Sequence, residues 1–231
     1  MIYNFHHNLN WSTFWTASGV IVALLLGIAG MFQDWVRAWF KKPNLNITIK
    51  LSPPDCHMIP MRNFMTNQTV YDTFYFRFRV ENIGNYQADE VEAMVVELYK
   101  SVKSKYEKVV NFLPLNLVWA HSFARQITKP KIQPSLFKYL DFGHIVKSEF
   151  ADLDSFGLKN RNKIVFILDT EVPPNTGSHI IFPGDYKIKI KFAGNNLKPI
   201  EKIYKLVIKD DWTTDETIML QNNILIEETN L

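Results

Sequence analysis

The first 33 residues contain no aspartate, glutamate, lysine or arginine, and this absence of charge constrains the fold more than any other feature of the chain. Within this stretch the run from Phe14 to Phe32 is almost entirely apolar. At about 1.5 Å per residue a helix over this run would be roughly 28 Å long, close to the hydrocarbon thickness of a bilayer. We therefore predict a transmembrane helix within an N-terminal anchor and juxtamembrane turn, residues 1–43.

Tryptophans flank the predicted helix on both sides. Trp11 and Trp15 lie at one boundary and Trp35 and Trp39 at the other, and indole rings favour the interface between acyl chains and headgroups. A cleaved signal peptide is the alternative. It requires a basic leading region, and the first 13 residues contain no lysine or arginine.

The charges beside the helix predict its orientation. Arg37, Lys41 and Lys42 follow the helix, whereas only the terminal amine, His6 and His7 precede it. The positive-inside rule then places the N-terminus outside and residues 44–231 in the cytoplasm, at the inner (plasma) membrane. A stripe of small residues, Gly19, Ala23 and Gly27, would let a second helix approach closely, and this predicts homo-oligomerisation through the helix. The alternative is that small residues are simply common in membrane helices.

From residue 44 onward the dominant hydrophobic period is two. Phe74, Phe76 and Phe78 alternate with polar residues, which predicts a strand with one face on a core. Further strands are predicted at 45–51, 91–99, 108–113, 138–145, 163–169, 186–192, 203–209 and 223–227. About nine short strands indicate an all-β fold, an antiparallel β-sandwich over residues 44–209.

Other elements are few. A short helix is expected at 215–221, capped by Thr213 or Thr214. Two long connections, 52–69 and 118–135, contain prolines and are predicted to be loops. Long loops on a rigid sandwich often carry binding residues.

Two local motifs resemble a known class of domain. The segment Val80-Glu81-Asn82-Ile83-Gly84-Asn85 is similar to a strand and turn of immunoglobulin-like bacterial adhesion and CARDB-type modules, and Pro183-Gly184-Asp185-Tyr186 is similar to their entry to a late strand. The whole layout also resembles uncharacterised single-pass bacterial membrane proteins with such a domain. The resemblance implies the fold but no activity and no functional residues.

Catalytic and metal-binding patterns do not stand out. The single cysteine, Cys56, excludes an internal disulfide framework, and no two histidines have the helical spacing of a metal site. The pair Cys56-His57 and the acids Asp152 and Asp154 are better interpreted as loop residues than as ligands. Without a Gly-x-Ser-x-Gly, phosphate-loop or kinase motif, we predict a non-enzyme without a cofactor, while a hydrolase site assembled from distant loops stays open.

Charge is distributed unevenly. Residues 44–209 contain 23 basic and 16 acidic side chains, a balance of +7, whereas residues 210–231 form an acidic segment with none basic. A basic face can bind anionic lipid headgroups, an anionic nucleotide or an acidic protein. Lysines on exposed strands also prevent edge pairing without any ligand. The modest balance argues against nucleic acid as the main ligand. The candidate anion-binding residues are Arg77, Arg79, Lys187, Lys189, Lys191 and Lys205.

The acidic segment offers two alternatives. Asp210-Asp211-Trp212 would either dock on the basic face of the sandwich or end the chain in solvent. Docking by charge would be loosened by salt.

Three functional hypotheses follow. The first is a non-enzymatic single-pass membrane protein whose cytoplasmic sandwich is a binding or scaffold module. The second is a membrane effector of a stress or antiviral pathway, whose sandwich senses a nucleotide signal and whose helix perturbs the bilayer on association. The third reverses the topology and predicts an envelope-facing glycan-binding module that uses Tyr71, Tyr75 and Trp119.

Overall fold

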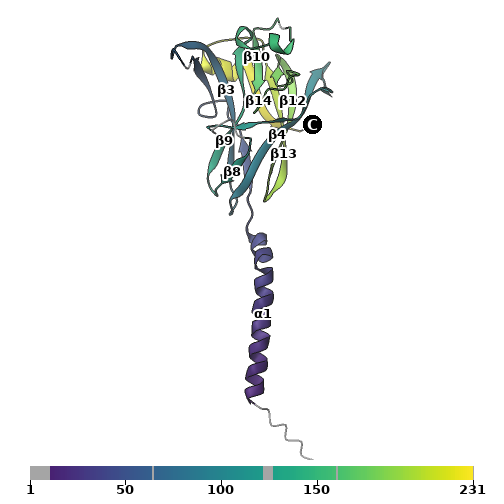
Figure 1. Ribbon diagram of the computed structural model, residues 1–231. Coiled ribbons are helices and arrows are strands. Elements are labelled where there is room, and N and C mark those ends of the chain that lie inside the picture. The colour runs from purple at the N-terminus through teal and green to yellow at the C-terminus, as the bar shows by residue number, and fades with distance from the viewer. Residues whose placement is uncertain (1–10, 64, 122–126, 160, 231) are drawn as a thin grey trace, which may run out of the picture. The chain divides into compact units, whose positions relative to one another are not determined.

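The computed structural model describes residues 11–63, 65–121, 127–159 and 161–230, with backbone only at residues 34–39 and 130. Two compact units are present, Met1–Lys42 and Pro43–Leu231. The first contains the helix α1 (Trp11–Phe40), drawn in purple in Figure 1. Its stretch Trp11–Gln33 is long and apolar enough to span a membrane, and none of it is buried within the protein. The predicted apolar helix is confirmed; its place in a membrane stays a prediction.

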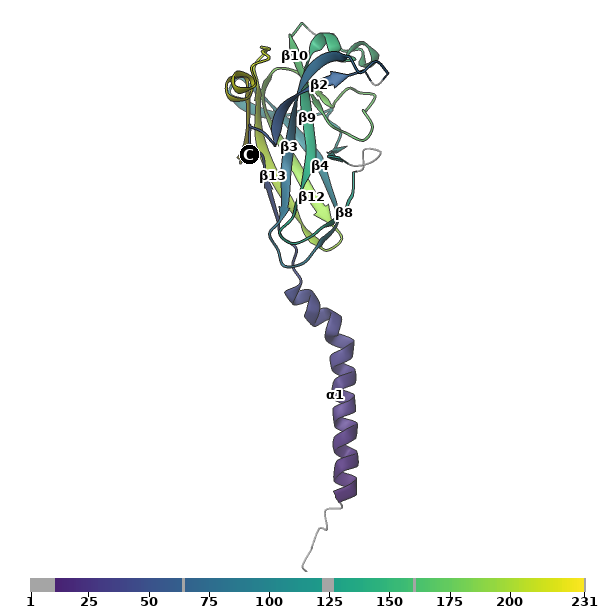
Figure 2. The same ribbon diagram turned by 90° about the vertical axis from the view of Figure 1, so that its left-hand side faces the viewer.

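The second unit is built from two antiparallel sheets, which the views of Figures 1 and 2 show from two sides. The strands of the first sheet are β1 (Leu45–Thr48), β2 (Cys56–Arg62), β3 (Thr69–Asn82), β7 (Val118–Trp119), β9 (Phe137–Lys147), β10 (Ile164–Leu168) and β11 (Ile180–Ile181). Their spatial order is β1-β3-β9-β10-β11, with β2 paired to β3 and β7 paired to β9.

The strands of the second sheet are β4 (Ala88–Val102), β5 (Lys105–Lys108), β6 (Leu115–Asn116), β8 (Lys129–Ile132), β12 (Gly184–Gly194), β13 (Leu197–Ile208) and β14 (Ile224–Thr229). Their order is β14-β13-β12-β4-β5, and β6 and β8 also pair with β4. Short helical turns connect the strands: η2 (Ser148–Phe150), η3 (Asp154–Phe156), α2 (Glu216–Ile218) and the π-helical η4 (Met219–Asn223). The predicted two-sheet, all-β fold is confirmed.

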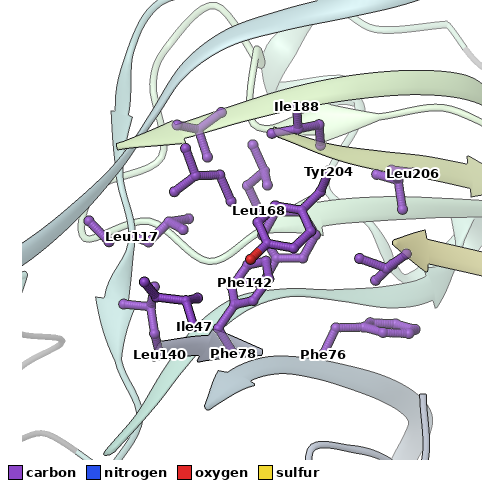
Figure 3. Close-up of a cluster of buried hydrophobic side chains, with 14 of the residues drawn as sticks. Ile47, Phe76, Phe78, Leu117, Leu140, Phe142, Leu168, Ile188, Tyr204 and Leu206 are labelled. Carbon is purple, nitrogen blue, oxygen red and sulfur yellow. The ribbon is translucent and has the colours of Figure 1, made fainter. Parts of the chain in front are cut away.

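The core lies between the sheets, because long strands such as β3 and β12 bury alternate side chains. On β3 the residues Phe74, Phe76, Phe78 and Val80 are fully buried, while the residues between them are partly exposed. Burying such a side chain contributes roughly 1.5–3 kcal/mol, so this alternation fixes which face of the strand points inward. Figure 3 shows the two sides of this core meeting: Phe76, Phe78 and Phe142 from the first sheet, and Ile188, Tyr204 and Leu206 from the second.

The long connections contain strands that the sequence pattern did not predict. Residues 52–69 include β2, which pairs with β3 and carries Pro60. Proline is tolerated there because β2 pairs with β3 on one side only, as an edge strand does. Residues 118–135 include β7 and β8. The strand predicted at 108–113 is wrong, because β5 ends at Lys108. β5 forms a hairpin with the end of β4.

The boundary predicted at residue 209 is corrected by the pairing of the last strand. β14 pairs with β13 along six residue pairs, and Met219 and Leu220 are buried in the common core. The acidic segment is therefore neither a separate part nor a solvated end. Its short helix is present as expected, but Asp215 caps it by accepting from the Ile218 amide, in place of Thr213 or Thr214.

Candidate functional site

The six predicted anion-binding residues do not form one face. Arg77 and Arg79 lie on β3 in the first sheet, whereas the four lysines lie on β12 and β13 in the second. The core separates these strands, so their outward side chains point to opposite sides of the sandwich. Alternation along a strand predicts which side chains point outward, but it does not tell to which sheet the strand belongs.

The lysines of the second sheet lie beside carboxylates. Lys189 Nζ is 3.7 Å from Glu97 Oε2 and 3.1 Å from Glu201 Oε2, and Lys191 Nζ is 3.6 Å from Glu201 Oε1. Lys187 donates to the Asn230 carbonyl, and Lys205 is opposite Glu227 in the strand register. This outer face is a lattice of alternating charges, which favours solvation and protection of the sheet over the binding of an anion.

The two arginines of the first sheet are also engaged. Arg77 Nε donates to Asp141 Oδ1 at 3.0 Å, and both side chains are largely buried. The Arg79 guanidinium lies 3.8 Å from the centre of the Phe137 ring. Each guanidinium group therefore contacts a neighbour within the first sheet and lies apart from the four lysines.

A polar cluster that the sequence did not indicate surrounds Arg77. His144 Nδ1 lies 3.0 Å from Asp169 Oδ1, and Tyr75 stacks on the His144 ring at 5.2 Å between centroids. Burial, with a smaller contribution from the Asp169 carboxylate, raises the pKa of Asp141 to about 6, although Arg77 acts in the opposite direction. The cluster therefore holds a carboxyl group that titrates near neutral pH.

A pocket of about 360 Å³ lies at one end of the sandwich, where β9 ends and β10 begins. Three stretches that are distant in the sequence meet there, and its lining residues are Lys147, Ser148, Glu149, Asn162, Lys163 and Trp212. The volume falls in the lower part of the range typical of small-molecule sites. An indole, two ammonium groups and one carboxylate thus surround a space large enough for a small ligand.

The acidic segment places Trp212 in this pocket. Asp210 Oδ1 accepts from the backbone amides of Lys163 at 2.6 Å and Ile164 at 3.3 Å, which ties the end of β13 to the start of β10. The Trp212 ring meets the buried Phe74 ring edge to face, with 5.4 Å between centroids. The start of the segment therefore binds main-chain amides and the core. Its end contacts the basic face considered from the sequence, because β14 pairs with β13 and the Asn230 carbonyl accepts from Lys187.

The remaining candidates fall in other places. Burial raises the pKa of the Cys56 thiol to about 12, which keeps it protonated and poor as a ligand or nucleophile. Trp119 is buried and donates to the Val91 and Ile127 carbonyls, so it offers no platform for a glycan. Tyr71 stacks on Phe150. Within the described residues, no three histidine, cysteine, aspartate or glutamate side chains are grouped to hold a metal ion.

On the helix, Trp11 and Trp15 are exposed, and a Cβ added at Gly19 or Gly27 would contact nothing within 4 Å. Ala23 is exposed as well, so the small-residue stripe is uncovered in the single chain. The side chains of Trp35 and Trp39 lie outside the described residues, as do His6 and His7. The expected contact between two helices stays a prediction.

The pocket could not have been located from the sequence, because its residues carry no motif. Its only sequence signal is Trp212, an indole directly after the acids Asp210 and Asp211. Together, the fold and the pocket define a two-sheet β protein that follows a helix able to span a membrane. No protein-family model and no curated protein matches the chain.

Proposed function

We propose that this is a single-pass membrane protein whose β-sandwich is a non-enzymatic binding module on the cytoplasmic side. The apolar helix supplies the anchor, and Arg37, Lys41 and Lys42 beside it favour a cytoplasmic C-terminal unit. β1 begins at Leu45, so the sandwich starts only a few residues after the helix ends. A short connection of this kind would keep the module at the membrane surface.

The pocket that contains Trp212 is the observation that carries this proposal. None of its six lining residues is a histidine or cysteine, and its ionisable side chains are substantially exposed. Exposed ammonium and carboxylate groups can contact a ligand, and the lining has neither of the two side chains that most often act as general base or nucleophile at neutral pH. The pocket therefore supports binding in preference to chemistry.

The immunoglobulin-like assignment belongs to the same proposal. As in that fold, β3 and β4 lie in different sheets, and the later hairpin β12–β13 joins the sheet of β4. The first sheet differs in its chain order, because β9, which is next to β3, precedes the outer β10, whereas the corresponding immunoglobulin order is reversed. The domain is best regarded as a variant of that sandwich.

Protease protection tests the anchor and its orientation. We expect residues 44–231 to resist protease in spheroplasts that carry the full chain and to be digested once the membrane is opened, with an exported and a cytosolic protein as controls. Digestion in intact spheroplasts would overturn the cytoplasmic assignment and favour an envelope-facing module.

A stability screen tests the binding role. The full chain in detergent is heated with small molecules grouped as anions, cations and neutral compounds, beside the Trp212→Phe variant. A compound that raises the unfolding midpoint of the wild type by binding, and raises it clearly less in the variant, supports a module with this pocket. A screen without any compound of this kind would contradict it.

The membrane-effector hypothesis is a second candidate, and the uncovered stripe on α1 favours it. If helix association perturbs the bilayer, Gly19→Ile together with Gly27→Ile should abolish growth inhibition on induction, because bulky side chains prevent close approach. Inhibition unchanged by these substitutions would sink the hypothesis.

A further inference from the structure

The pocket presents a fixed aromatic surface. Trp212 is held from the core side by Phe74, and two residues before it Asp210 is bonded to the first amides of β10. An indole that is already ordered loses little conformational entropy when a ligand packs on it. Its exposed part therefore suits a flat ring, which gains dispersion and stacking contacts.

Two ammonium groups accompany this surface. Lys147 Nζ lies 5.9 Å from the centre of the Trp212 ring, and Lys163, at the start of β10, lines the same pocket. Both arise from the ends of strands in the rigid sheet. A ligand stacked on the indole would consequently have a cation close to it.

The acids near these lysines do not remove the positive character of the pocket. Glu149 Oε1 is 3.8 Å from Lys147 Nζ, and Asp211 Oδ1 is 3.2 Å from Lys163 Nζ. All four side chains are more than 40% exposed, and exposed pairs contribute about 0–1 kcal/mol, so an anion can replace either acid at small cost. Asp210, by contrast, is bonded to backbone amides.

We propose that this pocket binds a small organic anion that carries a flat ring, with the ring on Trp212 and the anionic group between Lys147 and Lys163. The inference rests on the proposed binding function and names the class of ligand for the same site. The pocket volume of about 360 Å³ limits that ligand to a small molecule.

Three probes separate the two parts of this recognition. Adenosine 5′-monophosphate has both ring and anion, adenosine has the ring alone, and inorganic phosphate has the anion alone. Titrated calorimetrically into the full chain in detergent, the monophosphate should bind at least about tenfold more tightly than either of the others. Its binding should weaken as salt is raised, because ammonium contacts are screened.

Exposed lysines allow variants that leave the core untouched. Lys147→Gln and Lys163→Gln should each weaken the monophosphate about tenfold, the usual effect of losing one charged hydrogen bond. Lys198→Gln is the matched control, because Lys198 is exposed at the opposite end of β13 and should change the affinity less than twofold.

The outcomes are distinct. Equal binding of adenosine and the monophosphate, or unchanged affinity in both lysine variants, would overturn the anionic ligand class. So would absence of monophosphate binding at millimolar concentration. If only neutral or cationic compounds raise the unfolding midpoint in a way that depends on Trp212, the proposed binding function stands and this inference fails. If no compound raises the midpoint in a way that depends on Trp212, both fail.

Discussion

Asn82 shows how one buried polar side chain can join separate parts of the fold. Its Oδ1 accepts from the amides of Asn44 at 3.2 Å and Gly84 at 3.0 Å. Its Nδ2 donates to the carbonyls of Tyr86 at 2.7 Å and Ile132 at 2.9 Å. The residue is fully buried, and its bond to the Ile132 carbonyl is buried as well, whereas the other three bonds are partly exposed.

Asn82→Ala should lower the free energy of unfolding by about 3 kcal/mol, because it removes four hydrogen bonds to the backbone, one of them fully buried. Urea unfolding followed by circular dichroism measures this loss. Asn175→Ala is the control, since Asn175 is exposed in a loop, and it should change stability by less than about 0.5 kcal/mol. A similar small loss for Asn82→Ala would show that the amide bonds contribute little.

Asp141 predicts a dependence of stability on pH. Its pKa is raised from the ordinary value of 3.8 to about 6 in the folded protein, so folding favours the protonated form. The stabilisation is complete below pH 3.8 and is lost as pH rises through 6, by up to about 3 kcal/mol. Asp141→Asn should remove this fall between pH 4 and 6.

The measurement is the urea unfolding midpoint of the wild type minus that of Asp141→Asn at each pH. Asp154→Asn, at an exposed turn, should leave the pH profile as it is in the wild type. A wild type that gains stability relative to Asp141→Asn over this interval would mean that the Arg77 ion pair outweighs burial.

At the scale of elements, the segment after β13 links the two sheets through hydrogen bonds. Asp210 is bonded to amides at the start of β10, and Glu216 Oε1 accepts from the Met58 amide on the edge strand β2 at 3.0 Å. Both acceptors lie beyond β13 of the second sheet, while the donors belong to the first. These bonds close one end of the sandwich.

Adjacent aspartates allow a matched test of these hydrogen bonds. Asp210→Ala should cost about 1–2 kcal/mol, because two backbone amides lose a charged acceptor, whereas Asp211→Ala removes only an exposed ion pair and should cost less than about 0.5 kcal/mol. Urea unfolding at low and at 1 M salt measures both. Equal losses that vanish in salt would show that the segment is held by surface charge alone.

At the scale of the whole molecule, the hydrophobic core of the sandwich does not include the helix. All members of the hydrophobic core lie within Pro43–Leu231, and no part of the apolar helix stretch is buried. The apolar helix stretch is exposed, while the sandwich supplies its own core. Stability of the sandwich should therefore not depend on the anchor.

A chain of residues 43–231 should remain soluble without detergent and unfold in one cooperative transition, because its core is complete. Its urea midpoint should match that of the sandwich in the full chain within about 0.5 kcal/mol, by intrinsic fluorescence of both proteins. Aggregation of the shorter chain, or a clearly lower midpoint, would indicate that the helix contributes to the fold.

The sequence alone determined the apolar helix and most of the long strands. A charge-free apolar run has one low-energy form in a bilayer, a helix that satisfies its own backbone. Strict alternation, as in Phe74 to Val80, specifies a strand with one buried face. The alternation did not predict β2, because its buried and exposed residues do not alternate cleanly and it contains Pro60. Proline is tolerated there because an edge strand pairs on one side only.

Only the tertiary structure decided which side chains lie together on one surface. Arg77 and Lys187 both point outward from their strands, yet they lie on opposite sheets, and this assignment depends on long-range pairing. Lys147, Lys163 and Trp212 meet at the pocket because β9 pairs with β10 and Asp210 ties the end of β13 to the start of β10. Local patterns record burial, whereas a site depends on which buried faces pack together.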